Sequence, residues 1–429
     1  MSYGDIRFHA TLAQLVEQQT ENLRVWSSIL RGGNHKIPHL CYSLIMADTL
    51  HKARVEKIAA GGAGLARIEG KTVFIEGSAP GETVLCRTTT EHRSWVQAEL
   101  LEVIEPSPDR VQPACPLWGK CGGCNMQHLG YSAQLAAKTA ILREAFIRIG
   151  GFSPPQPLVF PSEPWEYRNR MQFHAIRQPQ TGESDTVWGL KARKKDEIIP
   201  ITDCPIADPG IRGKMQSQLL PPGRDRFTIY ARNGLFLSEG GTARGKTRVL
   251  DRELALDVGV FFQSNGTMLE KLIEDLQKIA ATADQNLPIA DLYCGVGTFA
   301  AFLGDLFPHI DLIEENKTAL ALARENLMRH QSAAFFAQRS EHWAHNGNAR
   351  RCGFITADPP RHGFDPALAR SLAADGPPLL AYISCEPATL ARDSAILLQG
   401  GYELRELRLY DFYPQTAHIE SLAVFIRLK

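Results

Sequence analysis

Three segments near the C-terminus carry side chains suited to covalent chemistry. Cys385 follows one buried β-run, Asp358-Pro-Pro-Arg361 follows the run before it, and Glu420 precedes the last run of the chain. Side chains just beyond the carboxyl ends of parallel strands line the active cleft of an open α/β sheet. The order predicts Cys385 as a nucleophile with a carboxylate nearby. The alternatives are a buried cysteine without a catalytic role, which is the commoner case, and an exposed Glu420.

A glycine loop upstream suits a nucleoside cofactor. Asp291-Leu-Tyr-Cys-Gly-Val-Gly-Thr-Phe299 stands where a buried strand ends and a helix begins, and glycines there let the backbone approach a ligand closely. Glu314, nineteen residues after Gly295, is placed to hold ribose hydroxyls. Gly295, Gly297 and Ala300 also fit the dinucleotide pattern G-x-G-x-x-A. The loop alone therefore leaves a nicotinamide cofactor open.

Cysteines form a second group. Cys115, Cys121 and Cys124 lie among glycines, a spacing that can wrap one metal centre, and three unligated cysteines are the alternative. The spacing is not the C-x3-C-x2-C of a radical enzyme that leaves one iron open, so we expect a structural role. Because nine cysteines is an odd count without a secretory context, a disulfide framework is not expected.

The elements that must position these residues change type along the chain. Residues 46–106 show five short β-runs between glycine turns (52–58, 64–68, 72–75, 82–89 and 95–104), which predict a small OB-like barrel. Residues 107–257 are loop-rich, with one helix over 131–149 and mixed strands. From 258 to 429, strands at 289–292, 310–313, 354–357, 379–383 and 422–427 alternate with helices at 266–283, 317–329 and 387–398. This alternation predicts an open, mostly parallel Rossmann-like sheet with helices on both faces.

The first 45 residues differ from the rest. Permitted codons for Leu12 to Leu30 can spell the dihydrouridine-loop, anticodon-arm and T-loop strings of a tRNA gene. We expect residues 1–45 to be a spurious or disordered extension with the real start at Met46. An amphipathic helix over residues 12–30 that docks on the body is the alternative.

Charge and hydropathy limit the class of protein. There are 47 basic and 47 acidic residues, 44% of residues are hydrophobic, and no apolar run approaches the 18 or so residues of a membrane span. Without a signal peptide, a cytoplasmic protein with no membrane partner is expected. Between Pro164 and Arg252, however, sixteen Lys and Arg face ten Asp and Glu. A basic stripe with interspersed aromatics suits phosphate contacts and base stacking, and a solvated sheet face explains it equally well. Its members are Arg168, Arg170, Arg177, Lys191, Arg193, Lys194, Lys195, Arg244, Lys246 and Arg248, with Tyr167, Phe173 and Trp188.

Taken in order, the motifs resemble a known family. Gly259-Val-Phe-Phe-Gln-Ser-Asn265, the Asp291 loop, Asp358-Pro-Pro-Arg361, Ser384-Cys385 and His418-Ile-Glu420 are similar to those of bacterial uracil-5 RNA methyltransferases. The resemblance is to the iron–sulfur, ribosomal-RNA branch, which has an N-terminal TRAM domain of OB type. It implies an α/β Rossmann-like methyltransferase domain (258–429), an RNA-binding barrel (46–106) and a mixed α+β central domain with an iron–sulfur cluster (107–257). Glu386 departs from the asparagine usual after the nucleophile.

The chemistry of that reaction accounts for the residue types. Carbon 5 of uracil is a poor nucleophile until a thiolate adds to carbon 6, after which it can attack a sulfonium methyl. A base must then remove the carbon-5 proton so that the thiol leaves. The resemblance assigns these roles to Cys385 and Glu420, and the uridine must leave its stack to reach them.

The resemblance also implies two cofactors. S-adenosylmethionine would be bound by Gln263, Asp291, Tyr293, Gly295, Gly297, Glu314 and Asp358, with Gln263 and Asp358 holding uracil and cofactor in register. A [4Fe–4S] cluster would be bound by Cys115, Cys121, Cys124 and Cys204, and zinc is the chemical alternative.

The resemblance favours 23S ribosomal RNA as substrate, with transfer RNA as the alternative, and a monomeric enzyme. Two other functions stay open on the motifs alone. One is an RNA-binding homologue without activity, against which the intact Cys385, Glu420 and Asp358 argue. The other is an NAD-dependent oxidoreductase.

Overall fold

The computed structural model describes residues 50–428 apart from 178–185, 194–195, 218–224 and 331. The expectation for residues 1–45, and Lys194 and Lys195 of the basic stripe, lie outside these residues. By its internal contacts the described chain divides into two compact units, one of residues 50–59 and 63–108 and one of residues 60–62 and 109–428. Residues 107–257 and 258–429, which the sequence separates, therefore belong almost entirely to one unit.

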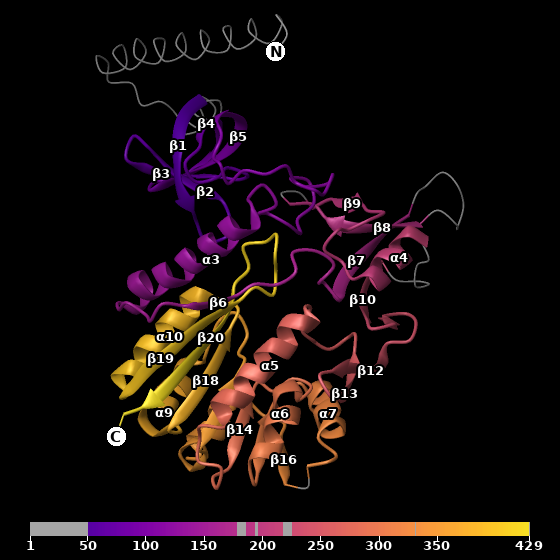
Figure 1. Ribbon diagram of the computed structural model, residues 1–429, viewed down its shortest axis with the longest axis vertical. Helices are drawn as coiled ribbons and strands as arrows, with labels where there is room; N and C mark the ends of the chain where they lie inside the picture. Colours follow the sequence, from indigo (N-terminus) through magenta and orange to yellow (C-terminus); the bar gives the residue numbers. More distant parts are fainter. Residues whose placement is uncertain (1–49, 178–185, 194–195, 218–224, 331, 429) are drawn as a thin grey trace, which may run out of the picture. The chain divides into compact units, whose positions relative to one another are not determined.

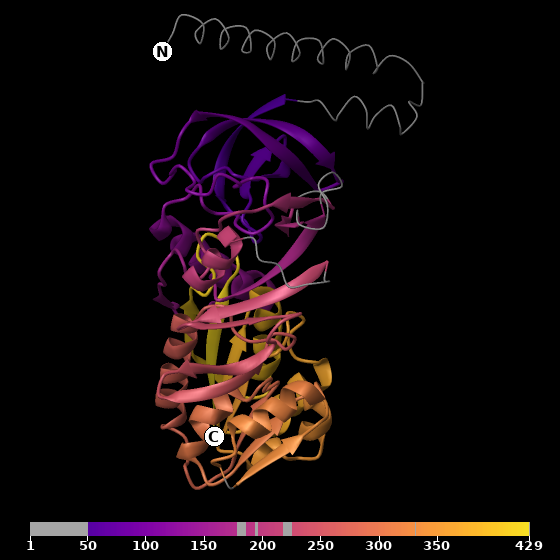
Figure 2. The same ribbon diagram turned by 90° about the vertical axis from the view of Figure 1, so that its right-hand side faces the viewer.

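The first unit is a closed barrel, visible as the indigo strands of Figure 2. Its strands follow the order β1-β2-β3-β5-β4, and inward side chains such as Val55, Val73 and Val84 fill its core. The barrel that the sequence predicts from five short β-runs between glycine turns is confirmed. Its strands are β1 (Leu50–Ile58), β2 (Gly64–Ile68), β3 (Lys71–Ile75), β4 (Thr83–Glu91) and β5 (Trp95–Glu105).

The second unit begins with helical and mixed segments. The predicted helix over residues 131–149 is present, but its last turn is a π-helix. A five-stranded sheet of order β11-β10-β7-β8-β9 and the hairpin β12–β13 follow. The elements are α3 (Tyr131–Ala145), η1 (Phe146–Gly150), β7 (Arg170–Arg177), β8 (Thr186–Lys191), β9 (Ile198–Pro200), α4 (Pro209–Ser217), β10 (Arg226–Arg232), β11 (Leu235–Ser238), β12 (Arg244–Val249) and β13 (Arg252–Asp257).

The prediction that the aromatic residues of the basic stripe stack on RNA bases is wrong. Phe173 and Trp188 are fully buried, their rings pack at an interplanar angle of 55° with centroids 4.8 Å apart, and Tyr167 is buried with them. Arg170 also points inward and donates to the carbonyl of Val258 at 3.0 Å. These side chains form the core of the five-stranded sheet, so they offer no stacking surface for RNA bases. Aromatic residues on a half-buried strand most often serve such packing.

An eight-stranded sheet organises the rest of the unit, as the orange and yellow strands of Figure 1 show. Its order is β16-β15-β14-β17-β18-β20-β19-β6, and β14 to β18 pair in parallel. The strand β20 runs antiparallel to both of its neighbours. The strands are β6 (Leu158–Phe160), β14 (Ile289–Leu292), β15 (Ile310–Ile313), β16 (Ala333–Phe336), β17 (Phe354–Ala357), β18 (Leu379–Ser384), β19 (Tyr402–Tyr410) and β20 (Glu420–Arg427).

Helices cover this sheet in two groups, as the two views show. In one, α5 packs on α6 and α6 on α7, and in the other, α9 lies between α8 and α10. Most begin at caps that the sequence supplies. Asn265 accepts from the backbone of Met268, and Asn316 from those of Thr318 and Ala319. The elements are α5 (Gly266–Ala280), α6 (Thr298–Leu303), η2 (Gly304–Leu306), α7 (Lys317–Asn326), α8 (Ser340–His345), η3 (Ala349–Arg351), α9 (Pro366–Asp375) and α10 (Pro387–Gln399).

No helix among the described residues combines the length and the apolar character needed to cross a membrane.

Candidate active site and cysteine pocket

Strand register brings the predicted nucleophile and the predicted base together. The antiparallel pair β18–β20 aligns Ser384 with Ser421, so that Cys385 and Glu420 are the next residues along the two chains. The parallel pair β17–β18 aligns Ala357 with Tyr382, so Asp358 leaves the sheet at the same edge. Three residues separated by up to 62 positions in sequence therefore meet at the carboxyl ends of β17 and β18.

The pKa values of the two acids and of the thiol at this edge are all raised. Burial, with Glu420 and Asp358 nearby, raises the pKa of the Cys385 thiol to about 12, and only Arg361 opposes the rise among the side chains. Burial and the neighbouring Asp358 raise the pKa of Glu420 well above its usual range. Burial raises the pKa of Asp358 to about 7. A cationic group entering this edge would stabilise the ionised forms.

Gln263 completes this group from the loop before α5. A hydrogen bond from its side chain lowers the pKa of Asp358. Its Oε1 atom is buried and has no hydrogen-bond partner among the described residues. A buried acceptor without a partner costs free energy, and a ligand with an N–H group can satisfy it.

Glu386, where the sequence departs from the family, has a structural role. Its carboxylate caps α10 by accepting from the backbone of Ala388 at 3.4 Å, and Pro387 occupies the first helical position. The backbone N–H of Glu386 donates to the hydroxyl of Ser384. Glutamate here performs the capping that asparagine commonly performs, so the turn that presents Cys385 is kept.

The loop that carries Asp358 is held by α10. Asp393, 1% exposed, accepts from the backbone of Phe364 and from the hydroxyl of Tyr382, both at 2.8 Å. Thr389 donates to the carbonyl of Arg361, and Arg392 to that of His362. The sequence Thr-Leu-Ala-Arg-Asp after the nucleophile therefore holds residues 358–364, a role that sequence reasoning did not assign.

The predicted cofactor loop lies between β14 and α6. Glu314 accepts from the backbone of Gly295 at 3.1 Å, which places its carboxylate beside the glycine turn. Asp291 is fully buried and accepts from the backbone of Ala300, so it shapes the turn from within. Tyr293 and Gly297 have φ of 59° and 74°. A Cβ at Gly297 would lie 2.9 Å from a methyl of Leu327, so glycine is required where the loop packs on α7.

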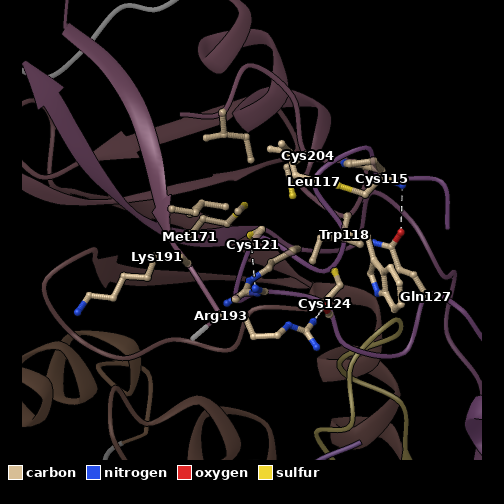
Figure 3. A pocket seen from close by; sticks show the side chains of 18 of the residues that line it. Cys115, Leu117, Trp118, Cys121, Cys124, Gln127, Met171, Lys191, Arg193 and Cys204 are labelled. Carbon is tan, nitrogen blue, oxygen red and sulfur yellow. Dashed lines mark hydrogen bonds between the residues drawn. The ribbon is translucent and has the colours of Figure 1, made fainter. Parts of the chain in front are cut away.

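The four predicted ligand cysteines border one cavity of about 290 Å³. Figure 3 shows Cys115, Cys121, Cys124 and Cys204 with their sulfur atoms around a common space. Burial raises the pKa of Cys121 and Cys124 above the usual range and that of Cys204 to about 12. Within the described parts of the chain, no three His, Cys, Asp or Glu side chains form a group that could hold a metal ion.

Tyr413 is a site residue that sequence reasoning missed. Burial and the neighbouring Glu420 raise its pKa to about 12, and its side chain hydrogen-bonds to Ser264. Tyr413 lies seven residues before Glu420. It is part of a loop, so no periodic pattern in the sequence could have indicated which residues it contacts.

The order and direction of the strands distinguish two classes of cofactor-binding protein. A dinucleotide-binding sheet has six parallel strands in the order 3-2-1-4-5-6. Here β20 enters antiparallel beside β18 and carries a carboxylate to the active edge. Together with the nucleophile and the glycine loop, this arrangement fits an α/β methyltransferase better than a dinucleotide-dependent oxidoreductase.

Comparison with known proteins gives the family. Residues 346–428 match the tRNA (uracil-5-)-methyltransferase family, residues 257–375 the methyltransferase small domain and residues 52–101 the TRAM domain. An uncharacterized RNA methyltransferase of Treponema denticola is 32% identical over 87% of this chain and 98% of its own length. A protein of Pseudomonas fluorescens named 23S rRNA (uracil(1939)-C(5))-methyltransferase RlmD is 30% identical over 86% of this chain and 93% of its own length.

A solved structure shares the fold. The tRNA (uracil-54, C5)-methyltransferase of Pyrococcus abyssi, in complex with S-adenosyl-L-homocysteine, superposes with a TM-score of 0.67 at 21% identity and covers 88% of this chain and all of its own. The chain belongs to the RNA uracil-5 methyltransferase family with an N-terminal TRAM domain. It is an S-adenosylmethionine-dependent enzyme, and the nicotinamide alternative is excluded.

Proposed function

We propose that this enzyme methylates carbon 5 of a uridine in 23S ribosomal RNA through a covalent bond between Cys385 and carbon 6. The name of the Pseudomonas fluorescens relative supports this substrate. Transfer RNA is the second candidate, because the Pyrococcus abyssi protein of the same fold is named for a tRNA uridine.

The observation that carries the mechanism is the adjacency of Cys385 and Glu420 at the end of the pair β18–β20. Burial raises the pKa values of both groups, and a cation bound beside them opposes this shift, so that both can ionise when the cofactor is bound. The bound S-adenosylmethionine supplies an activated methyl group on a positively charged sulfonium. A positive charge beside Cys385 favours the thiolate, and Arg361 acts in the same direction.

The proton balance assigns the last step to Glu420. Addition of the Cys385 thiolate to carbon 6 makes carbon 5 nucleophilic, and carbon 5 takes the methyl group while still bearing its proton. The Glu420 carboxylate then accepts that proton, the electron pair restores the C5–C6 double bond, and the Cys385 thiolate leaves. A buried carboxylate with a raised pKa is a stronger base than an exposed one, and burial of Glu420 (4% exposed) provides this.

Gln263 is the proposed contact to the uracil ring. Its buried Oε1 lacks a partner among the described residues and can accept from the N3–H group of uracil, while its hydrogen bond to Asp358 fixes the amide. Asp291, Tyr293, Gly295, Gly297 and Glu314 would surround the cofactor nucleoside.

Cys115, Cys121, Cys124 and Cys204 are the proposed ligands of a [4Fe–4S] cluster. The four cysteines border one cavity of about 290 Å³, which has room for an inorganic core. Zinc is the chemical alternative, because sites built from four cysteines hold either group. The bound cluster would close the loops between residues 115–124 and Cys204.

The cluster has a direct test. Anaerobically purified protein should be brown, absorb broadly near 400 nm and contain about four irons per chain. A Cys204→Ala variant should lose most of the iron and melt at lower temperature, because the closed loops are released. A colourless protein with one zinc per chain would show that the assignment is wrong.

The substrate is tested by methyl transfer from labelled S-adenosylmethionine. Purified 23S ribosomal RNA and bulk transfer RNA from cells lacking the gene are offered separately, with Cys385→Ala as the control. Label is expected in 23S RNA as 5-methyluridine and at none of its uridines with the variant. Label in transfer RNA alone would replace the proposed substrate, and label retained by Cys385→Ala would remove the covalent mechanism.

A further inference from the structure

The segment that leads into Glu420 contains no strand or helix. Residues 411–419, which we call the base loop, connect β19 to β20 and appear as the yellow loop between these strands in Figure 1. Although most of the loop is buried, the sheet does not fix its course. Its conformation must therefore come from contacts with other segments.

The first set of contacts comes from α3. Gln134 accepts from the backbone N–H of Gln415 at 2.9 Å, and its Nε2 donates to the side-chain oxygen of Gln415 at 3.0 Å. Both glutamines are buried, at 1% and 4% exposure. One turn further along, Lys138 donates to Asp411 at 2.5 Å and to the carbonyl of Tyr413 at 2.9 Å.

The second set comes from the segment that carries the cysteines. The carbonyl of Gln415 accepts from the backbone N–H groups of Asn125 and Met126 at 3.1 and 2.9 Å. The side-chain oxygen of Asn125 accepts from the backbone of Ala417 at 2.8 Å. Asn125 directly follows Cys124. The base loop is thus bonded to the residue next to a proposed cluster ligand.

Gln415 shows that these contacts impose the loop conformation. Its φ is +67°, in the left-handed region that costs a residue with a side chain about 1 kcal/mol or more. Such a conformation persists only where the surroundings determine it. At Gln415 the backbone N–H, the carbonyl and the side-chain oxygen are all bonded, and the four hydrogen bonds involve Gln134, Asn125 and Met126.

We propose that Asn125 and Gln134 are positioning residues for Glu420, and that through them the cysteine segment controls the last step of the reaction. The inference rests on the proposed role of Glu420 as the base. Addition of Cys385 and methyl transfer depend on β18 and the 358–364 loop, which make none of these contacts. Loosening the base loop should therefore slow transfer of the carbon-5 proton to Glu420, and with it the expulsion of the Cys385 thiolate, more than the earlier steps.

A fluorinated substrate separates the steps. In RNA with 5-fluorouridine, carbon 5 bears fluorine in place of the proton that a base removes, so the methylated adduct forms and stays. Adduct formation on this RNA reports addition and methyl transfer, while turnover on uridine RNA also requires the base. The variants are Gln134→Met, which keeps the length of the side chain, and Asn125→Ala. Thr139→Val is the matched control on α3, because the Thr139 hydroxyl donates to Leu135 of the same helix.

For Gln134→Met and Asn125→Ala, uridine turnover should fall about tenfold or more while adduct formation on fluorouridine RNA stays within about threefold of the parent enzyme. A methylated adduct should accumulate on uridine RNA as a slow band on a denaturing gel. Backbone hydrogen exchange over residues 411–420 should accelerate, since the N–H groups of Gln415 and Ala417 lose their acceptors. Thr139→Val should change none of these quantities.

The outcomes separate the inference from the function on which it rests. If both assays fall in parallel, or neither changes, Asn125 and Gln134 do not position the base. If Glu420→Gln accumulates the adduct and these variants do not, the inference alone is wrong. If Glu420→Gln turns over normally, the assignment of the base fails and the inference fails with it. If one variant does not fold, the other decides.

Discussion

Two loops bring functional side chains to the same edge of the sheet, and they are held in different ways. The loop 358–364 is bonded to α10, which starts at the turn after Cys385, so its anchors lie about thirty residues away in sequence. The base loop 411–419 is bonded to Gln134 and Asn125, which precede it by 281 and 292 residues. One loop is therefore fixed by the methyltransferase fold itself and the other by a segment outside it.

This difference divides the expected effects of substitution. Changes around 358–364 should act on the binding of uracil and cofactor and on formation of the covalent bond. Changes around 411–419 should act on the later breaking of this covalent bond.

The largest expected effect comes from the proposed nucleophile, Cys385, and the proposed base, Glu420. Cys385→Ala removes the attacking thiol, so methyl transfer should fall to background and no RNA should become attached to the protein. Glu420→Gln keeps the shape of the side chain but removes its basicity, so methylated RNA should stay attached. A denaturing gel with labelled S-adenosylmethionine distinguishes the two results.

The double variant is the control for this pair of substitutions. Cys385→Ala with Glu420→Gln should give no attached RNA, because the bond cannot form. An attached species that survives loss of Cys385 would identify another nucleophile, and Cys294 and Cys352 would then be the first to examine. Both are buried, which raises the pKa of the Cys294 thiol well above its usual range and that of Cys352 to about 12.

A smaller effect is expected at the anchor of the other loop. Asp393→Ala leaves the N–H of Phe364 and the hydroxyl of Tyr382 without their acceptor inside the protein, which should cost roughly 2–4 kcal/mol of stability. KM for RNA should rise, while no methylated adduct accumulates. Kinetics and thermal unfolding measure both. Ser394→Ala is the neighbouring control, because the Ser394 hydroxyl donates to the carbonyl of Leu390 in the same helix. If methylated adduct accumulates in Asp393→Ala, the two loops do not act on separate steps of the reaction.

What the sequence could predict follows the same division. The strands 289–292, 310–313 and 354–357 were predicted to the residue, because each is a short apolar run that ends at a turn signal. The placement of Cys385 and Asp358 at one edge followed from the rule that active clefts lie at the carboxyl ends of parallel strands. Glu420 was placed beside them by the family resemblance alone, because the sequence did not show that β20 runs antiparallel. The family resemblance supplied their roles.

Other features were beyond sequence reasoning because their partners are distant. β6 has three residues, one of them exposed, and is a strand only because it pairs with β19. The bond between Gln134 and Gln415 spans 281 residues and leaves no local pattern. The prediction for Trp188 and Phe173 failed for the opposite reason, since they lie in a stretch of sequence with a surplus of basic residues while their neighbours in space are apolar.

The smallest expected effect is a pH dependence of the free energy of unfolding, which Asp358 in the 358–364 loop contributes. The pKa of Asp358 is raised to about 7, so between pH 4 and 7 the folded protein holds a proton that the unfolded chain has lost. Stability therefore decreases as pH rises through this window, by at most 1.36 kcal/mol per pH unit for one proton. In Asp358→Asn this decrease should be reduced, and we expect the variant to gain on the order of 1 kcal/mol relative to the parent enzyme between pH 5.5 and 7.5. Thermal unfolding without cofactor measures the difference. Glu420 gives a slope of the same sign, and the neighbouring Asp358 contributes to the rise of its pKa. The difference between parent and variant therefore reports Asp358 together with its effect on Glu420, and an equal pH slope in the two would mean that the Asp358 carboxyl is not protonated in the folded enzyme.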